Sequence, residues 1–163
     1  MLDFKPADIV LVHGDGPISQ LIEDVEHSPY SHTTGWVQAG ELIEANGFRR
    51  TGYQAADFYA GHADVFRFAG ATYEQLEKII EYVKKEVGSR YDFLLLFLEA
   101  IRYGLHNNSL LQKWYKEPFN SRICSTLWVD AYRAVGLDPC PGIRYPSPAD
   151  WGESKYMIKI GRY

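Results

Sequence analysis

The sequence has few cysteines, no excess of positive charge and no long hydrophobic run. Its two cysteines, Cys124 and Cys140, are too few for a disulfide framework. The net charge of −4 predicts no basic surface for nucleic acid. The longest apolar run, residues 93–98, is far shorter than the roughly 20 residues that a membrane-spanning helix needs. We therefore expect neither a disulfide scaffold nor nucleic-acid binding, and no integral membrane segment.

Common targeting and cofactor motifs are also missing. Residues 1–6 lack the basic region and apolar run of a signal peptide, so we expect a cytoplasmic protein. The chain has no H-E-x-x-H, paired C-x-x-C, G-x-x-x-x-G-K or G-x-S-x-G pattern. We expect no cofactor and no metal, and the expected partner is a small-molecule, peptide or acyl substrate. The sequence carries no signal for an oligomeric state.

The patterns that are present predict one α+β domain over residues 1–163. Composition is ordinary for a globular protein, with 46% hydrophobic and 23% charged residues. Alternating and β-branched runs predict strands at 8–13, 31–38, 41–46, 48–53, 64–68 and 157–160. Helical spacing predicts helices at 18–26, 73–87, 92–103 and 124–135. We expect a small antiparallel sheet, curved towards a barrel, with the helices on one side.

Two of these helices carry clear end signals. Thr72 and Gln75 form a capping-box pattern, and Gly88 and Gly136 suit left-handed helix ends. The helix predicted at 73–87 is expected to bury an apolar stripe: Leu76, Ile79, Ile80, Val83 and Val87.

Cys124 lies at the predicted start of the last helix. Free N–H groups and the positive end of the helix dipole stabilise a thiolate there, and the thiolate is the nucleophilic form of cysteine. A cysteine at such a position also suits a small buried hydrophobe. Both interpretations stay open on position alone.

A reactive thiolate needs a base, and the chain offers five histidines. His32 begins a predicted strand, a rigid position from which an imidazole can face a helix end. His13, which closes a strand beside a glycine turn, is the second candidate. The remaining three, His27, His62 and His106, lie in polar loop-like settings typical of surface histidines.

Glu44 is the candidate for the group that orients the histidine. It lies in the apolar stretch Leu42-Ile43-Glu44-Ala45, where an unpaired carboxylate would be costly on a core face. A connection with an odd number of residues places His32 and Glu44 on one face of the sheet. A two-residue Ala39-Gly40 turn without a bulge places them on opposite faces. A solvent-facing glutamate is the competing interpretation.

The ordered set of these segments resembles a known family. The segments are 8–12, Ser28-Pro29-Tyr30-Ser31-His32, 42–45, Tyr91-Asp92-Phe93, Cys124-Ser125-Thr126-Leu127-Trp128 and Ser147-Pro148-Ala149-Asp150. Together they look like the circularly permuted papain-like amidases of the NlpC superfamily, the YiiX-like group. Residues 7–151 carry the resemblance. Histidine and acid precede the cysteine, as a permutation requires.

The resemblance implies a cysteine hydrolase with an SH3-like barrel packed against helices. It implies Cys124 as nucleophile, His32 as general base, Glu44 as orienting acid and the Tyr91 hydroxyl as an aid to the oxyanion. The implied reaction is hydrolysis of an amide bond in a peptide or cell-wall-type substrate. The alternatives are an acyl ester, lipid or thioester substrate on the same triad, or a non-catalytic binding module. Thr126 stands where family members commonly have glutamate, which puts the capping of this helix in question.

Overall fold

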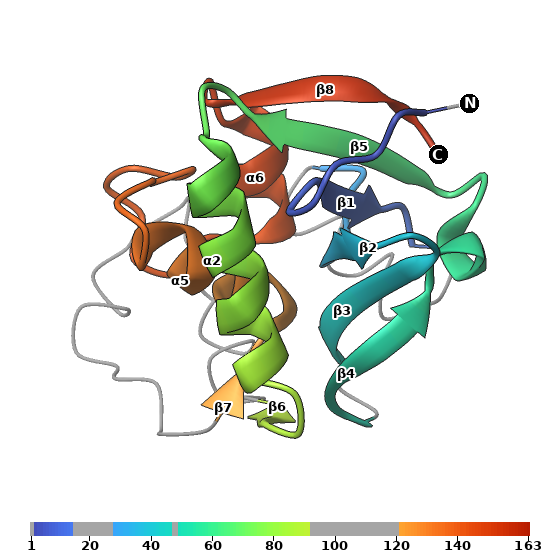
Figure 1. Cartoon of the computed structure of the whole chain (residues 1–163). Coiled ribbons are helices and arrows are strands. Elements are labelled where there is room, and N and C mark those ends of the chain that lie inside the picture. The colour runs from blue at the N-terminus through green and yellow to red at the C-terminus, as the bar shows by residue number, and fades with distance from the viewer. Residues whose placement is uncertain (1, 15–27, 47–48, 92–120) are drawn as a thin grey trace, which may run out of the picture.

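The computed structural model describes residues 2–14, 28–46, 49–91 and 121–163. Its main element is an open antiparallel sheet of six strands in the order β4-β3-β2-β1-β5-β8 (Figure 1). These strands are β1 (Ile9–Val12), β2 (His32–Gln38), β3 (Glu41–Asn46), β4 (Arg49–Ala55), β5 (Ala63–Phe68) and β8 (Met157–Arg162). A separate parallel pair is formed by β6 (Arg90–Tyr91) and β7 (Ser121–Arg122). The fold is therefore α+β with an antiparallel sheet, as the sequence predicts.

The helices lie together beside this sheet (Figure 1). They are α2 (Tyr73–Lys85), α5 (Cys124–Arg133) and α6 (Pro148–Glu153), and a short 3-10 helix, η1 (Ala56–Tyr59), joins β4 to β5. Helix α5 packs against α2 and against β2 and β3. The predicted capping box of α2 is present, with Thr72 accepting from the Gln75 backbone N–H. Val87 was expected to be buried, but it follows the end of α2 and is 39% exposed.

Alternation along the strands divides the core into two clusters. On the face towards the helices, Ile9 and Leu11 of β1 pack with residues of α2, α5 and α6; we call this the helix-side core. On the other face, Val10 and Val12 pack with Leu42 of β3 and Tyr59 of η1; we call this the outer-face core. Side chains on successive strand residues point to opposite faces, so one short strand supplies both clusters.

Trp128 fixes the position of α5 on the sheet. Its indole N–H donates to the carbonyl of Ile43 at 3.0 Å, and the side chain is fully buried. It lies directly over Gly35 of β2, where an added Cβ would come within 2.4 Å of the ring. A glycine is therefore required at position 35 for α5 to lie this close. Truncating Trp128 would cost about 3–5 kcal/mol by leaving a cavity in the helix-side core.

The hairpin between β2 and β3 contains a bulge. Gln38 pairs with Glu41 across the two-residue turn Ala39-Gly40, with Gly40 at a φ of 78°. The register then shifts by one residue between Trp36 and Gln38, so that Gly35 pairs with Ile43. This extra residue reverses the parity that a two-residue turn would impose. As a result, the side chains of residues 32 and 44 point to the same face.

Other sequence predictions fall where the structure tests them only in part. The strand predicted at 48–53 is observed as β4, which spans Arg49–Ala55. The strand predicted at 157–160 extends to Arg162 in β8. Helix η1 and the strands β6 and β7 were not predicted. The helices predicted at 18–26 and 92–103 lie outside the described residues.

Candidate active site

Cys124 is the first residue of α5. The preceding residue, Ile123, has an extended backbone (φ −105°, ψ 168°), so the chain enters the helix abruptly at the cysteine. The Thr126 hydroxyl accepts the Ile123 backbone N–H at 3.1 Å and so caps the first turn. Thr126 therefore caps this helix, although family members commonly have glutamate at this position. The Cys124 side chain is 4% exposed.

This thiol lies close enough to the ring of His32, the first residue of β2, to raise the pKa of that ring by hydrogen bonding and charge. On its other side the ring lies 2.9 Å from Glu44, from Nε2 to Oε2. Because Nε2 is used by Glu44, Nδ1 is the nitrogen left for the thiol. Three side chains that are far apart in the sequence are therefore connected through one imidazole.

Glu44 is a buried carboxylate with four donors. Oε2 accepts from His32 and from the Tyr59 hydroxyl at 2.6 Å, while Oε1 accepts from Arg49 Nη2 at 2.8 Å and from Asn46 Nδ2 at 3.1 Å. Its side chain is only 1% exposed. The solvent-facing interpretation of Glu44 is therefore wrong.

The electrostatics of the pair follow from these contacts. Burial by itself lowers the pKa of His32, but hydrogen bonds and negative charge from Cys124 and Glu44 raise it to about 10. Burial raises the pKa of Glu44, but the hydrogen bond and charge of His32, with the bonds from Tyr59 and Arg49, hold it well below its usual range. The contacts therefore favour the protonated form of this histidine and the ionised form of this carboxylate.

Three groups around Glu44 were missed from the sequence: Tyr59, Arg49 and Asn46. Burial, then the charge and hydrogen bond of Glu44, raise the pKa of Tyr59, so its phenol keeps its proton and donates. Tyr59 had no signal, because it comes from the unpredicted helix η1. Arg49 and Asn46 had one, since an Asn-Gly pair such as Asn46-Gly47 often marks a hairpin.

Tyr91 of β6 lies in the strand that pairs with the segment leading to Cys124. Its backbone partner is Arg122 of β7, two residues before the cysteine. The role predicted for its hydroxyl lies outside what the structure describes.

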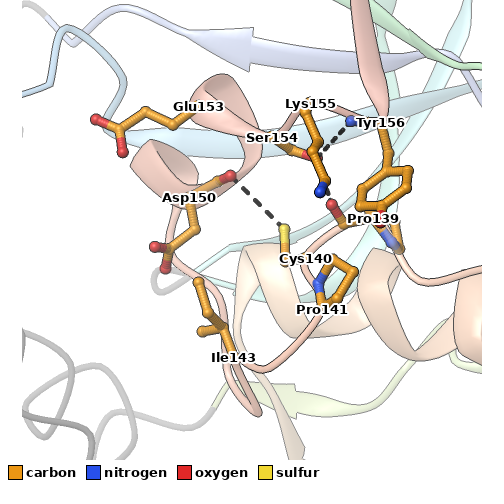
Figure 2. Close-up of a pocket in the computed structure, with 9 residues that line it drawn as sticks. All are labelled: Pro139, Cys140, Pro141, Ile143, Asp150, Glu153, Ser154, Lys155 and Tyr156. Atoms are coloured by element: carbon orange, nitrogen blue, oxygen red, sulfur yellow. Dashed lines mark hydrogen bonds between the residues drawn. The ribbon is translucent and has the colours of Figure 1, made fainter.

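The second candidate histidine and the second cysteine are placed elsewhere. His13 is not bonded to either cysteine in the described contacts; its Nε2 lies 3.1 Å from Asp64 Oδ2. Cys140 lies in a turn before α6, where its thiol donates to the Asp150 carbonyl at 3.7 Å (Figure 2). This thiol borders a cavity of about 290 Å³ whose lining does not include the Cys124 site. Although it is in a loop, Cys140 is also only 4% exposed.

Comparisons with known proteins support the fold. No family model matches the chain, and no curated protein matches it. Among solved structures, the chain is similar to the metalloprotein yiiX of Escherichia coli O157:H7, a DUF1105 protein, with a TM-score of 0.70 and 17% identity. The match covers 98% of this chain and 97% of that one. At this identity the two proteins share a fold, and a fold alone does not define an activity.

Two further features of the described residues bear on partners. No helix among them is long and apolar enough to cross a membrane. No three His, Cys, Asp or Glu side chains in the described ranges are grouped closely enough to hold a metal ion.

Proposed function

We propose that this chain is a cysteine hydrolase of permuted papain-like type, and that it cleaves an amide bond in a peptide or cell-wall-type substrate. The observation that carries the proposal is the His32 ring, which is bonded to a buried carboxylate and interacts with a cysteine at a helix start. That arrangement matches the generalised nucleophile, base and orienting-acid triad. The fold shared with yiiX supports it without defining the reaction.

In the proposed mechanism, His32 takes the thiol proton of Cys124 and the sulfur attacks the substrate carbonyl carbon. The C–S bond forms as the carbonyl becomes an oxyanion, which the Cys124 backbone N–H at the start of α5 is positioned to bind. The resemblance adds the Tyr91 hydroxyl as a second donor. The imidazolium then gives its proton to the leaving amine, and the C–N bond breaks to leave a thioester.

The second half of the reaction uses the same groups. His32 takes a proton from water, the hydroxide attacks the thioester, and the C–S bond breaks to release a carboxylic acid and restore the thiol. Glu44 holds the ring in one orientation and stabilises its positive charge throughout. The raised pKa of His32, about 10, favours the imidazolium form that donates to the leaving amine.

The description of yiiX implies a metal, and the described residues of this chain present no matching group of ligands. Glu44 already accepts four hydrogen bonds, and the described residues offer no cluster of three metal-binding side chains. No step of the proposed mechanism therefore runs through a metal ion.

Thiol reactivity tests the proposal directly. Iodoacetamide should modify Cys124 at pH 6 about tenfold or more faster than it modifies free cysteine, because an ordinary thiol is protonated at that pH. Mass spectrometry of the two cysteine peptides separates Cys124 from Cys140, which is equally buried and serves as the internal control. The proposal is wrong if Cys124 reacts no faster than free cysteine.

Turnover assays then identify the scissile bond. Peptide amides, acyl esters and acyl thioesters are incubated with the parent chain, with Cys124→Ala and with Cys140→Ala. We expect amide cleavage that is lost in Cys124→Ala and retained in Cys140→Ala. Cleavage of acyl probes alone would replace the amidase assignment by an acyl hydrolase. A reactive thiol without turnover on any probe would favour the binding module.

A further inference from the structure

Arg49 is a partly exposed residue that contacts the carboxylate of the candidate site. Its Nη2 donates to Glu44 Oε1 at 2.8 Å, and the same group donates to the side-chain oxygen of Gln54 further along β4. The Arg49 side chain is 43% exposed, whereas the carboxylate it contacts is 1% exposed. A guanidinium with two fixed acceptors brings a positive charge to an otherwise buried anion.

The donors to Glu44 are divided between its two oxygens. His32 and Tyr59 bond to Oε2, and Arg49 and Asn46 bond to Oε1. Arg49 therefore does not compete with the histidine for the same oxygen. Asn46 would still hold Oε1 in its absence, so the orientation of the carboxylate does not depend on Arg49 alone.

Among the described donors to Glu44, only His32 and Arg49 can carry a positive charge, and Arg49 is the one that contacts Oε1. The groups facing Glu44 are His32 from β2, Tyr59 from η1 and Asn46 from β3, with Cys124 beyond the histidine. When the thiolate and imidazolium have formed, the carboxylate leaves one negative charge in excess, and Arg49 cancels it. A net negative site would oppose formation of a second anion nearby.

We infer that Arg49 balances the charge of Glu44, so that this carboxylate orients the histidine without opposing the thiolate of Cys124. Arg49 is in this sense a positioning residue, and the inference rests on the proposed function. The neighbouring Arg50 provides a contrast, because it points to the Gly88 carbonyl at 2.8 Å instead. Equal charges one residue apart on β4 thus have different partners.

The test is the pH dependence of Cys124 alkylation. Rates with iodoacetamide are measured from pH 5 to 10 by mass spectrometry of the Cys124 peptide in four proteins: the parent chain, Arg49→Gln, Arg49→Lys and Arg50→Gln. Arg49→Gln removes the positive charge and keeps a hydrogen-bond donor, whereas Arg49→Lys keeps the charge. Arg50→Gln removes one positive charge at the neighbouring position. Circular dichroism checks folding. Arg49→Met is a second neutral variant in case Arg49→Gln does not fold.

We expect the midpoint of the acid limb to rise by about half to one pH unit in Arg49→Gln, the size expected for one partly screened charge. Arg49→Lys and Arg50→Gln should stay within about 0.2 units of the parent. An unchanged midpoint in Arg49→Gln overturns the inference. An equal shift in Arg49→Lys also overturns it, because the geometry of the guanidinium would then be the cause. An equal shift in Arg50→Gln overturns it too, because the total positive charge of the surface would then be the cause.

The parent chain separates this inference from the proposal beneath it. If parent Cys124 titrates in reactivity like an ordinary thiol, both are overturned. If the parent reacts well at acidic pH and Arg49→Gln behaves identically, only the role of Arg49 is lost.

Discussion

The sheet carries two clusters of nearly the same composition, and a cysteine interacts with the histidine of only one of them among the described residues. Each has a histidine, a tyrosine, a buried carboxylate and a cation: His32, Tyr59, Glu44 and Arg49 in one, and His13, Tyr30, Asp64 and Lys159 in the other. In each cluster the histidine and the tyrosine share one carboxylate oxygen. A histidine–carboxylate pair therefore does not by itself single out the candidate active site.

The clusters differ in what surrounds them. His32 pairs with Val12 of β1, while Asp64 pairs with Leu11, so their side chains leave the sheet on opposite faces. The start of α5 brings Cys124 to His32, whereas the remaining cysteine bonds to the Asp150 carbonyl. The cations also differ, since Lys159 bonds to the same oxygen of Asp64 as the histidine does. The neighbouring cysteine, more than the histidine–carboxylate pair, distinguishes the candidate active site.

The largest expected difference between the clusters is in thiol reactivity. His32→Gln should slow alkylation of Cys124 at pH 6.5 about 100-fold, because the thiolate loses its imidazolium partner. His13→Gln should change the rate by less than about twofold. The Cys124 peptide reports both by mass spectrometry. Comparable slowing in the two variants would mean that both clusters affect the reactivity of Cys124, which would contradict the difference between them.

The next difference is in stability at neutral pH, measured by urea unfolding. Glu44→Gln should lower the free energy of unfolding by about 3 kcal/mol, because it leaves the charges of His32 and Arg49 without their partner. Asp64→Asn should cost less, about 2 kcal/mol, since Lys159 is 52% and His13 26% exposed and water screens them. The reverse order would show that the His13 cluster is the main structural one.

Acid should destabilise the protein through both carboxylates. The pKa of Glu44 and that of Asp64 are lowered in the folded state, by their donors against the effect of burial. Each therefore contributes stability that is complete above the unfolded value, about 4.5 and 3.8 respectively, and is lost as the pH falls. The slope approaches about 1.4 kcal/mol per pH unit for each proton taken up. Urea unfolding between pH 5 and 3 should show a flatter decline in Glu44→Gln than in Asp64→Asn.

The smallest effects should come from the tyrosines. Tyr59→Phe and Tyr30→Phe each remove one hydrogen bond to a carboxylate, at 2.6 and 2.8 Å, and should cost about 1–2 kcal/mol. Tyr59→Phe should also raise the pKa of the His32 imidazole by a few tenths of a unit, because Glu44 Oε2 then has one donor fewer and attracts the imidazolium more strongly. Proton NMR of the His32 ring measures this shift. An equal shift in Tyr30→Phe would show that the two clusters are coupled.

Local pattern was enough to predict most of the fold. Alternation and helical spacing gave β2, β3, β5, α2 and α5 within a few residues, since each buries one face or stripe. Cys124 at the helix start and His32 at the strand start followed from the same boundaries. The antiparallel sheet with helices to one side is confirmed.

The rest depends on geometry that local pattern does not contain. Whether Glu44 shares a face with His32 was undecidable from spacing, because the answer lies in a bulge. Tyr59 reaches Glu44 from a 3-10 turn, and Arg49 reaches it across a hairpin. Such contacts arise from how strands curve and cross, and neither side chain belonged to a periodic run. The catalytic roles of the three triad residues stay predictions.

The bulge in the β2–β3 hairpin also makes the site unusually dependent on chain length at one point. Deleting a single residue there would turn Ile43 towards the histidine and press the carboxylate against Trp128, although every amino acid of the triad would still be present. For the same reason, aligning a distant relative through this hairpin without a gap would match Glu44 to an apolar position. Residue identity and residue count at this hairpin are thus separate requirements, and an engineered or evolved variant can fail either one.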